Sequence, residues 1–176
     1  MKSKVQIIYI FTLLIMVASS TAIAGDPTIY SENPNVEKFV TAPATSLGSS
    51  YESITSLLGK PLRQKEEKIY NKHNPDQIDL RRTIVYSYVT ITVYEVPAYN
   101  KSILESVDAT GELIKISNLI NFGAAKEKVI EVFGPPSYVI NNEISYKWAW
   151  EETEDTVSFK FNKNKLSRIV WSFFLD

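Results

Sequence analysis

A short stretch that occurs twice constrains the fold of this chain more than any other feature. It reads GSSYESITSLLGKP from Gly48 to Pro61 and GAAKEKVIEVFGPP from Gly123 to Pro136. The two copies align without a gap at one constant offset of 75 residues (123 − 48 = 75 and 136 − 61 = 75). Self-similarity at a fixed offset indicates an internal duplication, so the two stretches are expected to occupy equivalent places in the fold.

Each copy predicts a short helix that ends at a glycine. Apolar residues recur at helical spacing in both copies, at Ile54, Leu57 and Leu58 and at Val129, Val132 and Phe133. Gly59 and Gly134 follow, just before prolines that cannot continue a helix, so both are predicted to be C-caps and Gly134 to have a positive φ. Ser49 and Glu52 have the spacing of a capping box, a signal that the second copy lacks.

Strands are predicted after each helix, where the apolar residues begin to alternate with polar ones. In the second copy this alternation extends from Ile144 to Trp150, from Val157 to Phe161 and from Ile169 to Phe173. Asn141-Asn142 and the polar run 162–165 between these segments are typical of tight turns. Strands joined by tight turns are hairpins, so the sheet is predicted to be antiparallel.

The first copy repeats this pattern with a longer first hairpin. A polar strand is predicted from Leu62 to Tyr70, a turn from Asn71 to Asp76, and a later strand from Ser102 to Val107. No residue between Tyr86 and Ile91 is a good turn signal, which leaves two alternatives. The chain either turns tightly near Ser87 or continues as one bulged strand.

The predicted fold class is α+β: two tandem repeats, each a helix followed by antiparallel strands, form one continuous sheet with helices on one face. The predicted organisation is a signal peptide at 1–24, an extended leader at 25–45, a first repeat at 46–108, a packed connector at 109–120 and a second repeat at 121–176. The leader is predicted to be extended because prolines interrupt it, with at most a helical turn from Asn35 to Val40. The alternative is a mostly disordered arm.

The first residues have the features of a secretory signal peptide. Lys2 and Lys4 precede an apolar run from Val5 to Ala18, and small residues lead to a predicted cleavage after Ala24. We therefore expect a periplasmic or secreted protein without a membrane span. The chain has no cysteine, which argues against disulfides, thiolate metal sites and a lipid anchor. Without Lys2 and Lys4, 17 of the 19 basic residues remain against 20 acidic residues, so the formal net charge is negative (17 − 20 = −3). Nucleic acid is therefore not an expected partner.

A helix ending in (L/F)-G-x-P before antiparallel strands rich in Tyr, Trp and Phe resembles the domain of the SmpA/OmlA outer-membrane assembly proteins and of the β-lactamase inhibitory protein. The matching residues are Gly48 and Gly123 and the turns Gly59-Lys60-Pro61 and Gly134-Pro135-Pro136. The resemblance implies a tandem of two repeats whose strands share one sheet. The chain departs from both groups, because it has no cysteine to lipidate and none for the disulfide of each inhibitor repeat.

The sequence favours binding over catalysis, and no cofactor or metal is expected. His73, with Asp76 and Asp79 nearby, is the only histidine, and we interpret it as part of a solvated turn. We expect a non-catalytic module that binds a protein of the envelope or exterior, either an assembly adaptor or an inhibitor of an exported enzyme. The alternative is a small molecule, lipid or cell-wall fragment on the open sheet face.

The predicted binding residues lie on the sheet face opposite the helices or at strand ends. Side chains alternate across a strand, so residues between predicted core positions point to that open face. The candidates are Thr90, Thr92, Tyr94, Tyr99, Trp150, Ser158 and Lys160. Tyr94 is the expected aromatic anchor, and its truncation is expected to weaken binding while hardly affecting stability.

Overall fold

The computed structural model describes residues 30–71, 73–111, 118–150 and 153–175, which form helices packed on one antiparallel sheet. The signal peptide predicted at 1–24 and part of the predicted connector lie outside the described residues. The helical elements are α1 (Pro34–Leu47), α2 (Tyr51–Leu58), the 3-10 turn η1 (Pro97–Tyr99) and α3 (Lys126–Phe133). The strands are β1 (Arg63–Tyr70), β2 (Ile78–Val85), β3 (Val89–Val96), β4 (Lys101–Ala109), β5 (Tyr138–Ile140), β6 (Glu143–Trp150), β7 (Thr153–Asn162) and β8 (Lys165–Ser172).

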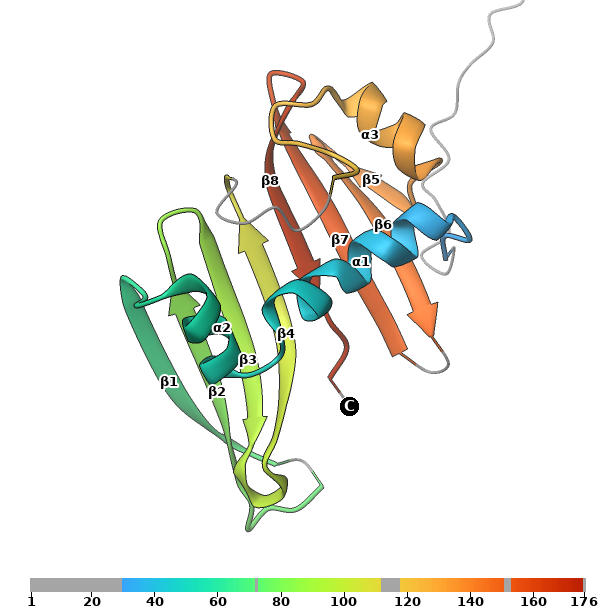
Figure 1. The fold of residues 1–176 in the computed structure, drawn as a ribbon. Coiled ribbons are helices and arrows are strands. Elements are labelled where there is room, and N and C mark those ends of the chain that lie inside the picture. The colour runs from blue at the N-terminus through green and yellow to red at the C-terminus, as the bar shows by residue number, and fades with distance from the viewer. Residues whose placement is uncertain (1–29, 72, 112–117, 151–152, 176) are drawn as a thin grey trace, which may run out of the picture.

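The sheet has eight strands in the order β1-β2-β3-β4-β8-β7-β6-β5 (Figure 1). Four strands that follow α2 therefore lie beside four strands that follow α3. The two sets are joined where β4 pairs with β8, from Ser106 opposite Ser172 to Ala109 opposite Ile169. Every pairing is antiparallel, which confirms the predicted α+β class and antiparallel sheet.

The structure decides between the two conformations considered for the segment from Tyr86 to Ile91, a tight turn or one bulged strand. The Tyr86 N–H donates to the Val89 carbonyl at 2.8 Å, so the chain turns tightly there and β2 and β3 are separate strands. In the second half, Asn141 and Asn164 have positive φ values of 52° and 61°, as their predicted places in tight turns require. Asparagine tolerates this conformation better than most residues, because its side chain bonds to the local backbone.

The N-terminal segment differs most from the sequence prediction. The expected extended leader instead contains the fourteen-residue helix α1, which begins at Pro34, directly after the N-cap Asn33. Five of its residues are buried at helical spacing: Val36, Phe39, Val40, Pro43 and Leu47. Pro43 argued against a helix in the sequence, because an interior proline usually ends or kinks a helix. Burial of this apolar stripe outweighs that local cost.

The carbonyl that Pro43 leaves without a helical donor finds another partner. In an α-helix the carbonyl of Phe39 would accept from the N–H of residue 43, and proline has none. The indole Nε1–H of Trp171 in β8 donates to this carbonyl at 3.0 Å instead. The tryptophan in the sheet therefore compensates for the proline inside α1, because the Phe39 carbonyl keeps a hydrogen-bond donor.

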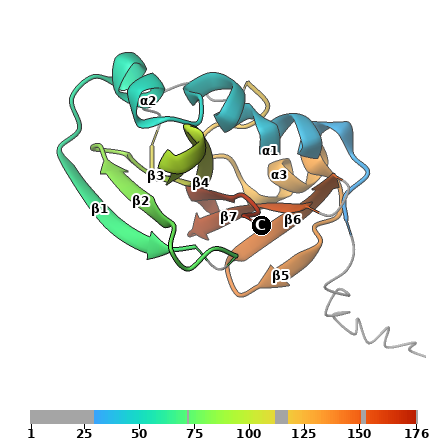
Figure 2. The same ribbon diagram turned by 90° about the horizontal axis from the view of Figure 1, so that it is seen from below.

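All three α-helices lie on the same side of the sheet (Figure 2). Helix α1 packs on β6 and β7, and it also contacts α2 and α3. The largest buried side chains beneath the helices include Phe39, Phe133, Tyr146, Phe159 and Trp171. The opposite face of the sheet, which we call the open face, is defined by the residues that alternate with this core.

The helix ends follow the predicted pattern, with one shift. Gly134 has a φ of 78° and Gly59 a φ of 76°, which confirms the C-cap prediction. The capping box of α2 uses Ser50 and Ser53, not Ser49 and Glu52 as predicted, because the helix begins one residue later. Helix α3 begins at Lys126, and its N-cap residue Ala125 gives it no side-chain cap.

Candidate functional site

The open face contains most of the predicted binding residues. Thr90, Thr92 and Tyr94 alternate along β3 with the buried Ile91 and Val93, so they point away from the helices. Ser158 and Lys160 alternate in the same way with Val157 and Phe159 in β7. The register places Thr90 and Ser158 in one cross-strand line, with Asp108 of β4 and Val170 of β8 between them.

Two of the predicted binding residues, Tyr99 and Trp150, are not among the described side chains of the open face. Tyr99 lies in η1 at one end of the sheet and is 73% exposed. Trp150 ends β6, and its side chain lies outside what the structure describes. Thr90, Thr92, Tyr94, Ser158 and Lys160 therefore share the open face at different places along it, and Tyr99 lies apart from them.

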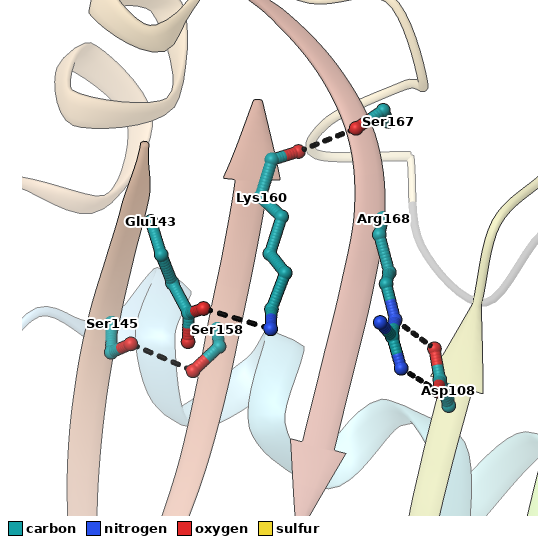
Figure 3. Close-up of polar contacts among 7 residues, drawn as sticks. All are labelled: Asp108, Glu143, Ser145, Ser158, Lys160, Ser167 and Arg168. Carbon is teal, nitrogen blue, oxygen red and sulfur yellow. Dashed lines mark hydrogen bonds and ion pairs between the residues drawn. The ribbon is translucent and has the colours of Figure 1, made fainter. Parts of the chain in front are cut away.

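Ser158 and Lys160 are already engaged with neighbouring strands, as Figure 3 shows. The Ser158 and Ser145 hydroxyls lie 2.7 Å apart and share a hydrogen bond between β7 and β6. The Lys160 ammonium lies 3.0 Å from a carboxylate oxygen of Glu143. These cross-strand contacts hold both side chains in defined positions, so a partner would meet an ordered surface.

Tyr94 is also held from within the molecule. Its hydroxyl donates to Asp79 Oδ2 at 2.6 Å, and Asp79 is fully buried. Asn71 and Gln77 each donate a side-chain N–H to the same carboxylate at 2.7 Å, which fixes the β1–β2 turn. Truncating Tyr94 would remove one donor from a buried carboxylate, so we now expect it to lower stability as well as binding.

This network shifts the pKa values of both acids. Burial alone would raise the pKa of Asp79, but the hydrogen bonds from Tyr94, Asn71 and Gln77 outweigh it and lower that pKa below its ordinary value. Burial and the bond to Asp79 raise the pKa of Tyr94 to about 12. The carboxylate and the neutral phenol are therefore the stable forms at neutral pH, and the network is structural.

Four ion pairs connect different strands on the open face, and their formal charges cancel. They are Arg81 with Glu105, Arg168 with Asp108, Lys160 with Glu143, and Lys147 with Glu154. The Arg168 guanidinium binds Asp108 through two nitrogens, in the fork geometry that arginine favours (Figure 3). The hydrogen bond from Lys147 lowers the pKa of Glu154. The face thus presents fixed, mutually neutralised charges.

A straight line of hydroxyl side chains, which we call the hydroxyl row, crosses the centre of the open face. The register aligns one residue from each of five adjacent strands: Thr83 of β2, Thr92 of β3, Ser106 of β4, Ser172 of β8 and Thr156 of β7. None of these hydroxyls has a hydrogen-bond partner among the described residues. The row therefore has free hydrogen-bonding capacity between charges that are already paired.

Sequence reasoning found only Thr92 of this row. Thr83, Ser106, Thr156 and Ser172 each follow or precede a core residue in their strand, and that alternation was the available signal. Their alignment depends on the pairing of β4 with β8, which lie far apart in the sequence. It also depends on a bulge in the β3–β4 pairing, between Thr92 and Val93, which no pattern in the sequence predicts.

A hollow of about 380 Å³ lies beside the hydroxyl row where the two halves of the sheet meet. Ser106, Thr156 and Ser172 line it together with Glu105, Glu154 and the C-terminal segment 173–175. This segment is fixed, because the Phe173 N–H donates to the Glu105 carbonyl at 3.0 Å and the Phe174 N–H to Asp155 Oδ1 at 2.9 Å. The Phe174 side chain remains 43% exposed.

His73 and the acidic residues near it do not assemble into a reactive centre in the described chain. The His73 side chain is exposed, while its backbone N–H donates to Asn71 Oδ1 at 2.9 Å. Within the described ranges, no group of three or more histidine and acidic side chains could hold a metal ion. In the same part of the chain, none of the helices is long and apolar enough to cross a membrane.

Comparison of the chain with protein-family models, curated proteins and solved structures returns no match. The arguments for function therefore depend on the geometry of the open face.

Proposed function

We propose that this protein is a non-catalytic, exported protein-binding module whose partner contacts the open face of the sheet. The observation that supports this proposal most is a wide sheet face opposite all three described helices, with side chains held by cross-strand pairs. Prepaired side chains lose less freedom when a partner binds, which lowers the entropic cost of association.

The size of the face fits a protein partner. Eight strands spaced at about 4.8 Å give a width of about 34 Å, and eight residues of strand give a length of about 26 Å. The product is roughly 900 Å², close to the roughly 800 Å² that each partner contributes to a standard interface. A small molecule would occupy only a fraction of this surface.

We also propose that the two halves arose by duplication, as the resemblance to the SmpA/OmlA proteins and the β-lactamase inhibitory protein implies. One detail of the packing supports this proposal. The Tyr86 hydroxyl donates to the Gly59 carbonyl at 3.0 Å, and the Tyr146 hydroxyl donates to the Gly134 carbonyl at 2.9 Å. Equivalent tyrosines thus bind the C-cap glycines of α2 and α3. The partner class remains the one inferred from the sequence, a protein of the envelope or exterior.

The test is a pull-down from envelope extract with the mature protein and two matched variants. Thr92→Arg places a long cation at the centre of the open face, where the native hydroxyl has no internal partner. Ser56→Arg makes a similar change on the exposed surface of α2, on the helical side. We expect the wild type and Ser56→Arg to recover the same protein and Thr92→Arg to lose it.

Thermal melting of all three proteins controls for folding. Recovery of the same protein by a folded Thr92→Arg variant would contradict the proposed surface. Recovery of no protein by the wild type would contradict the proposed class of partner.

A further inference from the structure

The hydroxyl row differs from the rest of the open face in its unused hydrogen bonds. The neighbouring charges are committed to ion pairs, such as Arg81 to Glu105 at 2.7 Å and Lys147 to Glu154 at 2.6 Å. The hydroxyls of the row have no partner among the described residues. Each hydroxyl can donate one hydrogen bond and accept two, so the row can recognise a group that does both.

The row is also long and straight. Five adjacent strands are separated by four spacings, which gives a length of about 19 Å perpendicular to the strands. Lys65 of β1 and Lys147 of β6 continue the row at its two ends, and each forms an ion pair with a glutamate. A ligand along the row would therefore meet hydroxyls in the middle and neutralised charges at both ends. An elongated, uncharged ligand fits this arrangement.

The hollow adds an apolar wall to one side of the row. Its volume of about 380 Å³ lies within the range of small-molecule sites. Three hydroxyls of the row, Ser106, Ser172 and Thr156, line it, and the half-exposed Phe174 belongs to the same lining. A sugar ring presents hydroxyl groups at its edge and C–H groups on its faces. Hydroxyls, carboxylate acceptors and an aromatic side chain complement both surfaces.

We infer that the hollow and the hydroxyl row form a binding site for a neutral glycan. One sugar ring occupies the hollow against Phe174, with the Glu105 oxygen that does not bind Arg81 as an additional acceptor, and the following rings extend along the row. Other ligand classes fit less well. An acidic or basic ligand would gain little from charges that cancel, and a lipid chain would leave the hydroxyls unpaired. The inference depends on the proposed function in one respect, that the open face is the binding face.

The experiment measures binding of three soluble neutral oligosaccharides to the intact mature protein: a chitin, a cellulose and a starch fragment. Calorimetry gives the affinity, and backbone NMR shifts give the location. We expect at least one oligosaccharide to bind, with shifts clustered at Thr92, Ser106, Ser172 and Phe174. Ser106→Ala and Ser172→Ala each remove a hydroxyl that has no internal partner, so the fold should be preserved.

Each of these alanine variants should weaken binding roughly threefold to tenfold, the usual effect of one hydrogen bond. Phe174→Ala should weaken binding by a similar factor, and Ser56→Ala on α2 should have no effect. Absence of binding by all three oligosaccharides overturns the inference. Unchanged affinity in the folded serine and Phe174 variants also overturns it, because the glycan would then bind elsewhere.

The result is separable from the proposed function. If no oligosaccharide binds but the pull-down still returns a protein that Thr92→Arg loses, the protein-binding function stands and the glycan site does not. If an oligosaccharide binds at the row and Thr92→Arg retains the protein, the glycan site stands and the protein surface lies elsewhere.

Discussion

The half of the sheet formed by β5 to β8 buries a cluster of aromatic rings among its aliphatic side chains, whereas the core of the half formed by β1 to β4 is mainly aliphatic. In the second half, Phe133, Tyr146 and Phe159 lie together with ring centroids 5.2 to 5.9 Å apart. In the first half, the fully buried positions are Ile54 of α2 and Ile84, Ile91, Val93 and Val107 of its strands. The two halves use similar elements but fill the space between helix and sheet differently.

The source of the difference is α1, whose Phe39 completes the aromatic cluster of the second half. The Phe39 ring lies 5.1 Å from Phe133, 5.5 Å from Phe159 and 5.3 Å from Trp171. The first half instead places Arg82 over the ring of Tyr51 at 4.6 Å, where it forms ion pairs with Glu66 and Glu95. The N-terminal helix thus stabilises the half that is more distant in sequence. The aromatic core of the second half therefore includes a side chain from a helix that precedes the first half in the chain.

The largest expected effect comes from removing the side chain that α1 gives to the second half. Phe39→Ala should destabilise the protein by about 3 to 5 kcal/mol, because it opens a cavity between three aromatic rings. Lys38→Ala, an exposed neighbour on the same helix, is the matched control. Urea denaturation gives both free energies of unfolding. A loss below about 1 kcal/mol for Phe39→Ala would mean that α1 is not needed by the second half.

The second prediction tests whether Pro43 and Trp171 are energetically coupled through the Phe39 carbonyl, which accepts the hydrogen bond of Trp171. Trp171→Phe leaves the Phe39 carbonyl without a donor, so it should cost about 1 to 3 kcal/mol in addition to any loss of packing. Pro43→Ala restores a backbone N–H that can bond to that carbonyl. In a double-mutant cycle, Trp171→Phe should therefore cost less in the Pro43→Ala background. Equal costs in both backgrounds would show that the two residues are independent.

Pro43 and Trp171 also show why the sequence did not predict helix α1. The spacing of Val36, Phe39, Val40 and Leu47 is that of a helix, but the interior proline argued against one. The compensating donor lies 132 residues away in the chain. A local pattern cannot reveal a tertiary hydrogen bond, so this part of the fold was beyond sequence reasoning.

Where the determinants are local, the sequence was sufficient. The C-cap glycines, the turns at Asn141 and Asn164 and the alternating strands β6 to β8 follow from short-range rules, and the structure has all of them. The alternation of Thr90, Thr92 and Ser158 with core residues is also a local pattern, so their positions on the open face were predictable. The hydroxyl row was not, because it depends on which strands pair and in which register.

The third prediction concerns the buried Asp79 network, which only the first half contains among the described residues. Asp79→Asn should cost on the order of 1 to 2 kcal/mol at neutral pH, because the new amide has fewer acceptor sites for the three donors. The folded-state pKa of Asp79 lies below its ordinary value, so the unfolded chain takes up the proton more readily. This stabilisation is fully present above about pH 4 and is lost as the pH falls toward the folded-state pKa.

The measurement is the free energy of unfolding of both proteins at a series of pH values. The difference between wild type and Asp79→Asn should shrink as the pH decreases below about 4. A difference that stays constant over that range would show that the Asp79 pKa is not lowered by folding.

The smallest expected effect concerns the N-terminal ends of helices α2 and α3. Ser50 caps α2 by accepting from the Ser53 N–H at 3.1 Å, whereas Ala125 at the start of α3 has no side-chain acceptor. Ala125 already has extended backbone angles (φ −69°, ψ 153°), as an N-cap residue requires. Ala125→Ser should therefore stabilise the protein by about 0.5 to 1 kcal/mol, and Ser50→Ala should destabilise it by about 1 kcal/mol.

Thermal and urea melting of the two variants, and of the double variant, measures how far the caps explain the difference between the helices. If Ala125→Ser gives no gain while Ser50→Ala gives a loss, the start of α3 is already stabilised by its surroundings. The backbone bond from the Leu166 N–H to the Ala124 carbonyl, at 2.8 Å, would then be the contact to examine.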